Sequence, residues 1–160
     1  MTDETNKAGL RVPVLLIIFS RPETTEQVLA AIRAVRPERL YIAADGPRAG
    51  RAEEAARCAV ARETALQVDW PCEVTTLFRD ENRGCAHGPS EAVSWFFEQE
   101  EMGIILEDDI LVSESFFWFC QEMLEKYRYD DEVMEIAAMN YLSDRPTRDG
   151  ASYYFSRMGS

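Results

Sequence analysis

Short apolar runs alternate along the chain with longer segments whose apolar residues recur at helical spacing. Runs of this length, rich in β-branched residues and bounded by turn residues, predict strands. They lie at residues 12–19, 39–44, 73–78, 103–108 and 132–140. The segments between them are rich in strong helix formers and predict helices. These lie at residues 22–36, 51–66, 91–101 and 113–129.

Strands that alternate with helices predict βαβ units, in which consecutive strands run parallel and helices cover both faces of the sheet. The predicted fold class is therefore α/β, with a doubly wound, Rossmann-like and largely parallel sheet. A length of 160 residues fits one domain with its own core, and the sequence contains no internal repeat and no convincing linker. We expect a single domain over residues 1–160.

The charge of the chain limits its partners. A hydrophobic content of 46% predicts a folded protein, and a formal net charge of -12 predicts an acidic surface. Such a surface repels a nucleic-acid backbone and an anionic membrane, so neither is expected as a partner. A phosphorylated ligand would need a local cation.

The cysteines and the amino-terminal region bear on location. The four cysteines include no CxxC pair, and His87 is the only histidine, which argues against a structural zinc site and favours reduced thiols. The apolar run at residues 12–19 is too short to span a bilayer, and no signal-peptide pattern precedes it. We expect a cytoplasmic protein without a transmembrane segment.

Polar residues gather directly after the predicted strands. They are Ser20 and Arg21; Asp45 and Gly46; Arg79, Asp80, Asn82 and Arg83; and Glu107, Asp108 and Asp109. In open α/β sheets, ligands bind outside the carboxyl ends of the strands, near the point where the strand order reverses. One crevice is therefore expected to contain these residues.

Glu107, Asp108 and Asp109 form an acidic triplet next to a buried strand. Adjacent carboxylates repel one another and are costly to desolvate, so a compensating charge is expected. Carboxylate oxygens suit Mg²⁺ or Mn²⁺, which usually also bind waters and substrate phosphates. The alternative is a solvated turn whose carboxylates face water.

Three other residues at the strand ends each have two interpretations. Arg21 can lie near the base or phosphates of a nucleotide, or it can pair with Glu23 at the surface. Asp45 can accept a hydrogen bond from a base or ribose, or it can cap its own backbone in an Asp-Gly turn. Arg83 and the start of the following helix can hold a diphosphate, or the NRG sequence can be only a tight turn.

Several stretches resemble a known family, the nucleotide-sugar-binding half of GT-A glycosyltransferases. The stretches are PVLLIIFSRPETTEQVLAAI, YIAADGPR, the segment from FRDENRG to FCQEML, and EIAAMN. They cover roughly residues 12 to 140, and the likeness is greatest to the N-acetylglucosaminyltransferase I type and to related bacterial nucleotide-diphospho-sugar transferases. The most specific part is EDD, followed by an apolar residue and later by SESFF, which is similar to that family's form of the DXD motif.

The resemblance implies roles for individual residues, with Mn²⁺ or Mg²⁺ as the cofactor. Asp109 would bind the metal directly, and Asp108 would be a second ligand or contact metal-bound water. Glu107 and Asp108 would also contact the sugar or ribose. Arg21 and Asp45 fall where the family reads the nucleotide base.

The implied activity is transfer of a sugar from a nucleoside diphosphate sugar to an acceptor hydroxyl on a glycan, lipid or protein. Asn140 falls near where family members face the sugar or the acceptor. Family members continue into a second half that binds the acceptor, whereas this chain stops at Ser160. We therefore expect a donor-binding part that is truncated before the acceptor half. The alternative is a non-catalytic, glycosyltransferase-like binding or assembly module.

Overall fold

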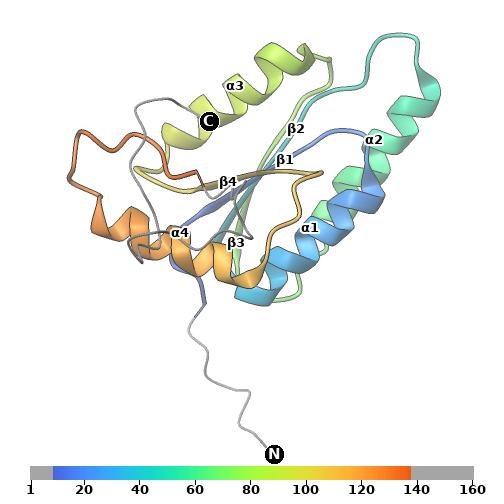
Figure 1. Ribbon diagram of the computed structural model, residues 1–160. Coiled ribbons are helices and arrows are strands. Elements are labelled where there is room, and N and C mark those ends of the chain that lie inside the picture. Colours follow the sequence, from blue (N-terminus) through green and yellow to red (C-terminus); the bar gives the residue numbers. More distant parts are fainter. Residues whose placement is uncertain (1–8, 138–160) are drawn as a thin grey trace, which may run out of the picture.

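The computed structural model describes residues 9–137, in which strands and helices alternate strictly (Figure 1). The strands are β1 (Val14–Ile18), β2 (Arg39–Ala44), β3 (Glu73–Phe78) and β4 (Ile104–Glu107). The helices are α1 (Pro22–Val35), α2 (Ala52–Ala65), α3 (Gly84–Phe97) and α4 (Glu114–Lys126). The predicted α/β class is confirmed.

All neighbouring strands pair in parallel, in the order β3-β2-β1-β4. Leu16 in the centre of β1 pairs with Ile42 on one side and Leu106 on the other. The chain moves outward from β1 to β3 and then returns through α3 to place β4 on the opposite side of β1. The strand order therefore reverses between β1 and β4, as in a doubly wound sheet.

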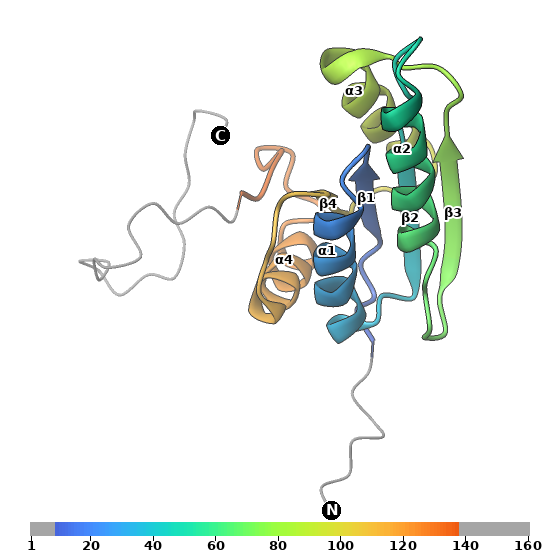
Figure 2. The same cartoon turned by 90° about the vertical axis from the view of Figure 1, so that its right-hand side faces the viewer.

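Helices cover both faces of this sheet (Figure 2). Leu16 on β1 packs in one core with residues of α1, α2 and α4, among them Ile32 and Phe117. Leu15 faces the other way and packs in a second core with Tyr41 on β2 and Phe96 on α3. Successive side chains of a strand point to opposite faces, so the unbroken apolar run of β1 supplies both cores.

Helix α3 begins earlier and ends earlier than the sequence predicted. The expected helix covers residues 91–101, whereas α3 spans Gly84–Phe97. Glycine and proline near its start are typical helix breakers, so the sequence predicted a later start. In the structure Gly84 is the first residue of the helix, with a positive φ of 80°, and Pro89 lies inside it. The tight turn expected at NRG therefore leads straight into α3.

The fifth strand, predicted for residues 132–140, is wrong for the part that the structure describes. Residues 132–137 form no strand, and Met134 is 97% exposed. A strand needs a hydrogen-bonded neighbour, and β4 pairs only with β1 among the described strands. Residues 138–140, including Asn140, lie outside the described residues.

None of the helices within residues 9–137 combines the length and apolar character needed to cross a membrane.

The four cysteines are free thiols that differ in exposure, and they yield the first prediction. Burial raises the pKa of Cys120 to about 11 and also raises the pKa of Cys58, whereas Cys85 is exposed at the start of α3. Because the thiolate is the nucleophile, iodoacetamide at neutral pH should modify Cys85 first and the two buried thiols only on unfolding. Mass spectrometry of timed samples measures this order. A Cys85→Ser variant should lose the fast step, and equal rates at Cys85 and Cys120 would contradict the burial described.

Candidate functional site

The acidic triplet forms a turn at the point where the strand order reverses. The amide of Asp108 donates to the carbonyl of Ile17 at 2.9 Å, which extends the β1–β4 pairing by one residue. The amide of Ile110 then donates to the carbonyl of Glu107 at 3.1 Å, which closes a turn around Asp108 and Asp109. The pleat sends Asp108 inward, where it is 1% exposed, and leaves Glu107 and Asp109 exposed.

Asp108 is held by protein donors at both carboxylate oxygens. Its Oδ2 accepts from the amide of Phe19 at 3.0 Å. Its Oδ1 accepts from Nε of Arg21 at 3.0 Å and from Nη2 at 2.5 Å. Because both oxygens are hydrogen bonded and the residue is only 1% exposed, Asp108 is far less accessible to a cation or a sugar than Asp109 while Arg21 stays in place. Asp108 therefore fixes the loop after β1 and the side chain of Arg21.

Arg21 supplies the positive charge that the acidic triplet needs. Its Nη1 donates to Oδ2 of Asp109 at 2.6 Å, so one guanidinium bridges two adjacent carboxylates. Burial opposes the charged form, but hydrogen bonds and charge attraction from Asp108 and then Asp109 outweigh it, and the pKa of Arg21 is raised. The alternative interpretation, in which Arg21 pairs with Glu23, is wrong, because Glu23 pairs with Arg57 at 2.9 Å.

The fit of a divalent cation to this turn depends on Asp109. Its side chain is 42% exposed, and only Oδ2 is hydrogen bonded within residues 9–137. The neighbouring carboxylate of Glu107 is exposed as well. In the described part of the chain, no group of three or more His, Cys, Asp or Glu residues could hold a metal. The residues therefore fit a cation only in the mode typical of Mg²⁺, with one or two carboxylates, several waters and substrate phosphates.

Asp45 lies after β2, with β1 between it and the strand that leads to the acidic turn, and its carboxylate binds backbone amides. Oδ1 accepts from the amide of Gly46 at 3.0 Å, which confirms the Asp-Gly turn. Both oxygens accept from the amide of Arg83 at 2.9 Å, and Oδ2 accepts from Gly84 at 3.1 Å. The amides at the start of α3, where one of the two interpretations of the sequence placed a diphosphate, are thus hydrogen bonded to Asp45. A carboxylate at a helix N-terminus is favourable for the same electrostatic reason as a phosphate.

Gly46 brings the loops after β2 and β3 into close contact. Nδ2 of Asn82 donates to the carbonyl of Gly46 at 2.8 Å. A Cβ at Gly46 would lie 2.5 Å from the backbone nitrogen of Glu81, which is closer than real Cβ contacts. The glycine is needed for this approach of two backbones.

Arg62 is a site residue that sequence reasoning missed. It lies on α2, and its Nη2 donates to the carbonyls of Asp45 and Arg79. These two hydrogen bonds join the loops after β2 and β3. Its guanidinium also lies 5.1 Å from the ring centre of Phe78. No local signal distinguishes Arg62 from the other charged residues of this helix, because its partners lie 17 residues away in either direction.

Arg83 places its side chain at the rim of the carboxyl edge. Its guanidinium is 56% exposed and lies 3.9 Å from Glu91, a long contact between exposed groups. Arg79, which is only 17% exposed, pairs with the same Glu91 at 2.9 Å. Arg83 is therefore the more accessible cation of the two.

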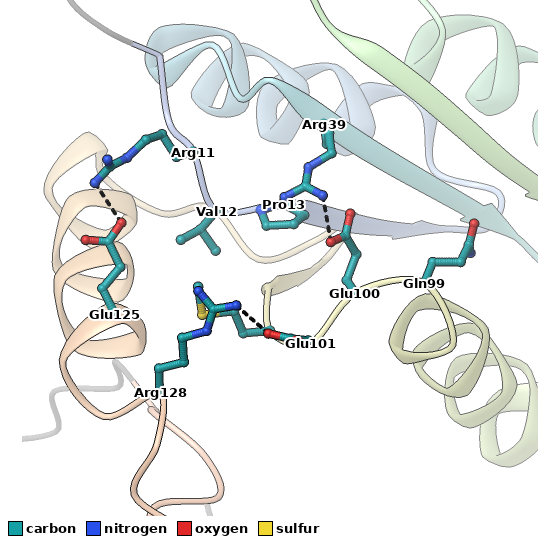
Figure 3. Close-up of a pocket in the computed structure, with 10 residues that line it drawn as sticks. Arg11, Val12, Pro13, Arg39, Gln99, Glu100, Glu101, Glu125 and Arg128 are labelled. Atoms are coloured by element: carbon teal, nitrogen blue, oxygen red, sulfur yellow. Dashed lines mark hydrogen bonds and ion pairs between the residues drawn. The ribbon is translucent and has the colours of Figure 1, made fainter.

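Two cavities lie at opposite edges of the sheet. One of about 560 Å³ lies at the amino edge, where three arginines already pair with glutamates: Arg11 with Glu125, Arg39 with Glu100, and Arg128 with Glu101 (Figure 3). Another, of about 360 Å³, lies at the carboxyl edge between the end of β1 and the start of α2, and its lining does not include the acidic turn. It is lined by Ser20, Arg51, Ala52, Glu53, Glu54 and Arg57. We place the candidate site at the carboxyl edge despite the smaller cavity, because parallel sheets bind ligands at the switch point.

The structure thus brings the sequence-predicted residues together in two adjacent groups. Arg21, Asp108 and Asp109 form one group at the ends of β1 and β4. Asp45 and Arg83 form the other at the ends of β2 and β3. Comparisons of this chain with models of protein families, with curated proteins and with solved structures found no match.

Proposed function

We propose that this chain binds a nucleoside diphosphate sugar at the carboxyl edge of its sheet and acts as a metal-dependent glycosyltransferase, or as the donor-binding part of one. One observation carries the proposal. A half-exposed arginine, Arg21, lies at the switch point between the buried carboxylate of Asp108 and the exposed carboxylate of Asp109. In an acidic protein, this local cation favours an anionic ligand, and the carboxylates favour a divalent cation.

Each of these residues would have a separate role in donor binding. Asp109 would hold Mn²⁺ or Mg²⁺, with Glu107 beside it, and the bound ion would offset negative charge that develops on the leaving diphosphate. Arg21 would donate to the anionic part of the donor, and Asp108 would orient Arg21. Arg83 offers a further exposed cation at the rim, and Asp45 would hold the loops that face the base.

The reaction would form a bond between an acceptor hydroxyl oxygen and the anomeric carbon, while the bond from that carbon to the diphosphate breaks. The proton of the hydroxyl would pass to a base outside the residues assigned above. We also propose a cytoplasmic location, which is supported by the free state of all four thiols.

A thermal-shift panel tests donor binding directly. UDP, GDP and dTDP sugars are each added with and without Mn²⁺, and a CMP sugar, which carries a single phosphate, is the control. A ligand that binds only the folded state raises its stability. Stabilisation by one of the nucleoside diphosphate sugars only in the presence of Mn²⁺ supports the proposal. No stabilisation by any of them would contradict it. Hydrolysis of the stabilising sugar nucleotide then separates an enzyme from a binding module.

Asp109→Ala should abolish the Mn²⁺-dependent part of nucleotide binding. The variant loses the exposed carboxylate that would bind the ion, whereas the fold should be affected by no more than about 0.5 kcal/mol, because an exposed ion pair contributes little. Calorimetric titration with nucleotide, in the presence and absence of Mn²⁺, measures the loss. Asp80→Ala, which removes an exposed carboxylate from the same edge of the sheet, is the matched control. Wild-type binding by Asp109→Ala would remove this residue from the site.

A further inference from the structure

We propose that Arg21 couples the two ligands of this site, so that the divalent cation binds Asp109 strongly only together with the anionic diphosphate. The inference rests on the proposed function and assigns its cooperativity to one side chain. Arg21 would act as a ligand-binding residue with two states, one that pairs with Asp109 and one that pairs with the diphosphate.

The two contacts of Arg21 differ in how easily they can break. The contact with Asp108 uses two nitrogens, and Asp108 is 1% exposed, so its separation would leave a buried carboxylate without its partner. The contact with Asp109 uses one nitrogen, Nη1, and both side chains are more than two-fifths exposed. Exposed pairs contribute little free energy. The Asp109 contact is therefore the one that a ligand can replace.

Arg21 opposes a cation that arrives alone. An ion at Asp109 has to compete with Nη1 for Oδ2, and it then lies beside a guanidinium of the same sign. The repulsion is strongest at short distance and where water is partly excluded, as it is around Asp108. A cation without the nucleotide should therefore bind weakly.

A diphosphate removes this opposition. Its oxygens can accept from Nη1, as in other pairs of arginine with phosphate, while Nε and Nη2 stay on Asp108. The freed Oδ2 of Asp109 and the phosphate oxygens then face the same cation. Because binding free energies are linked, each ligand raises the affinity of the site for the other by the same factor.

Replacement of Arg21 by glutamine tests the coupling. The Arg21→Gln side chain can still donate to Asp108 but carries no charge. The control is Arg33→Gln, which removes an equivalent charge from the other end of α1, where Arg33 pairs with Asp69 at 2.7 Å. Binding of Mn²⁺ alone is followed by the loss of its free-ion electron paramagnetic resonance signal. We expect Arg21→Gln to bind Mn²⁺ alone about fivefold or more tightly than the wild type, in line with ordinary coupling energies. Arg33→Gln should bind it as the wild type does.

The same titrations are repeated with UDP, GDP and dTDP in turn. The nucleotide that binds should raise the Mn²⁺ affinity of the wild type by a larger factor than that of Arg21→Gln. An unchanged or weaker affinity of a folded Arg21→Gln protein for Mn²⁺ alone overturns the inference, and so does an equal gain from the nucleotide in both proteins. If the wild type binds Mn²⁺ with a nucleotide and Arg21→Gln shows neither change, only the coupling fails. If no nucleotide binds to the wild type with Mn²⁺, the proposed function fails too.

A measurement on the wild type covers the case in which Arg21→Gln does not fold. Nitrogen-15 magnetic resonance of the arginine side chains is recorded with Mg²⁺ alone and with Mg²⁺ plus each nucleotide. The Nε signal of Arg21 should stay protected from exchange throughout, and its Nη signals should change when both ligands are present. A Nε signal that loses protection, or Nη signals that never change, would overturn the inference.

Discussion

Phe96→Ala is expected to lower the free energy of unfolding by about 3–5 kcal/mol, the range for removal of a large aromatic side chain from a core. Phe96 is fully buried, and α3 is the one described helix that covers its face of the sheet. Its ring meets that of Tyr41 edge to face, with centres 5.0 Å apart. It also packs directly over Gly103, where an added Cβ would overlap the ring.

Urea denaturation, followed by circular dichroism, measures this loss as a lower midpoint at unchanged slope. Phe97→Ala is the matched control, because Phe97 is the next residue of α3 and is 47% exposed. Phe97→Ala should lower the free energy of unfolding by clearly less than Phe96→Ala does. A cost below about 1 kcal/mol for Phe96→Ala would contradict the second core, since ordinary surface substitutions stay within about half of that figure.

Asp108→Ala is expected to destabilise the protein by about 2–3 kcal/mol in the absence of any metal. The substitution removes hydrogen bonds to a charged group and leaves the amide of Phe19 without its acceptor. Arg21 is 46% exposed and can turn to water, so the cost should stay below that of a fully buried ion pair.

The neighbouring Asp109→Ala variant is the control for this second prediction. Both variants lose one carboxylate of the same turn, but only Asp108 is buried. Urea denaturation without metal should therefore separate them, with little change for Asp109→Ala. Equal stability losses in the two variants would contradict the structural role given to the buried Asp108 and the exposed position given to Asp109.

The sequence was sufficient to predict the elements whose local hydrophobic pattern is strong. β1 and β2 are continuous apolar runs that only a sheet covered on both faces can bury, and both are found where they were expected. The start of α3 and the segment at residues 132–137 were predicted wrongly. Gly84 and Pro89 carry breaker signals that the fold overrides, and an apolar run becomes a strand only if a neighbour pairs with it.

The sequence by itself also determined which charged and polar residues lie at the carboxyl edge, because parallel strands end there together and such residues follow each of them. Only the tertiary structure decided which carboxylate of the acidic triplet turns inward. The β1–β4 pairing sets the direction of Asp108, and it brings Arg21 to that carboxylate from 87 residues away. A local pattern carries no information about a contact at such a separation, since strand pairing creates it. Arg21, which the sequence contained but could not place against these carboxylates, is therefore the charge that pairs with Asp108 and Asp109.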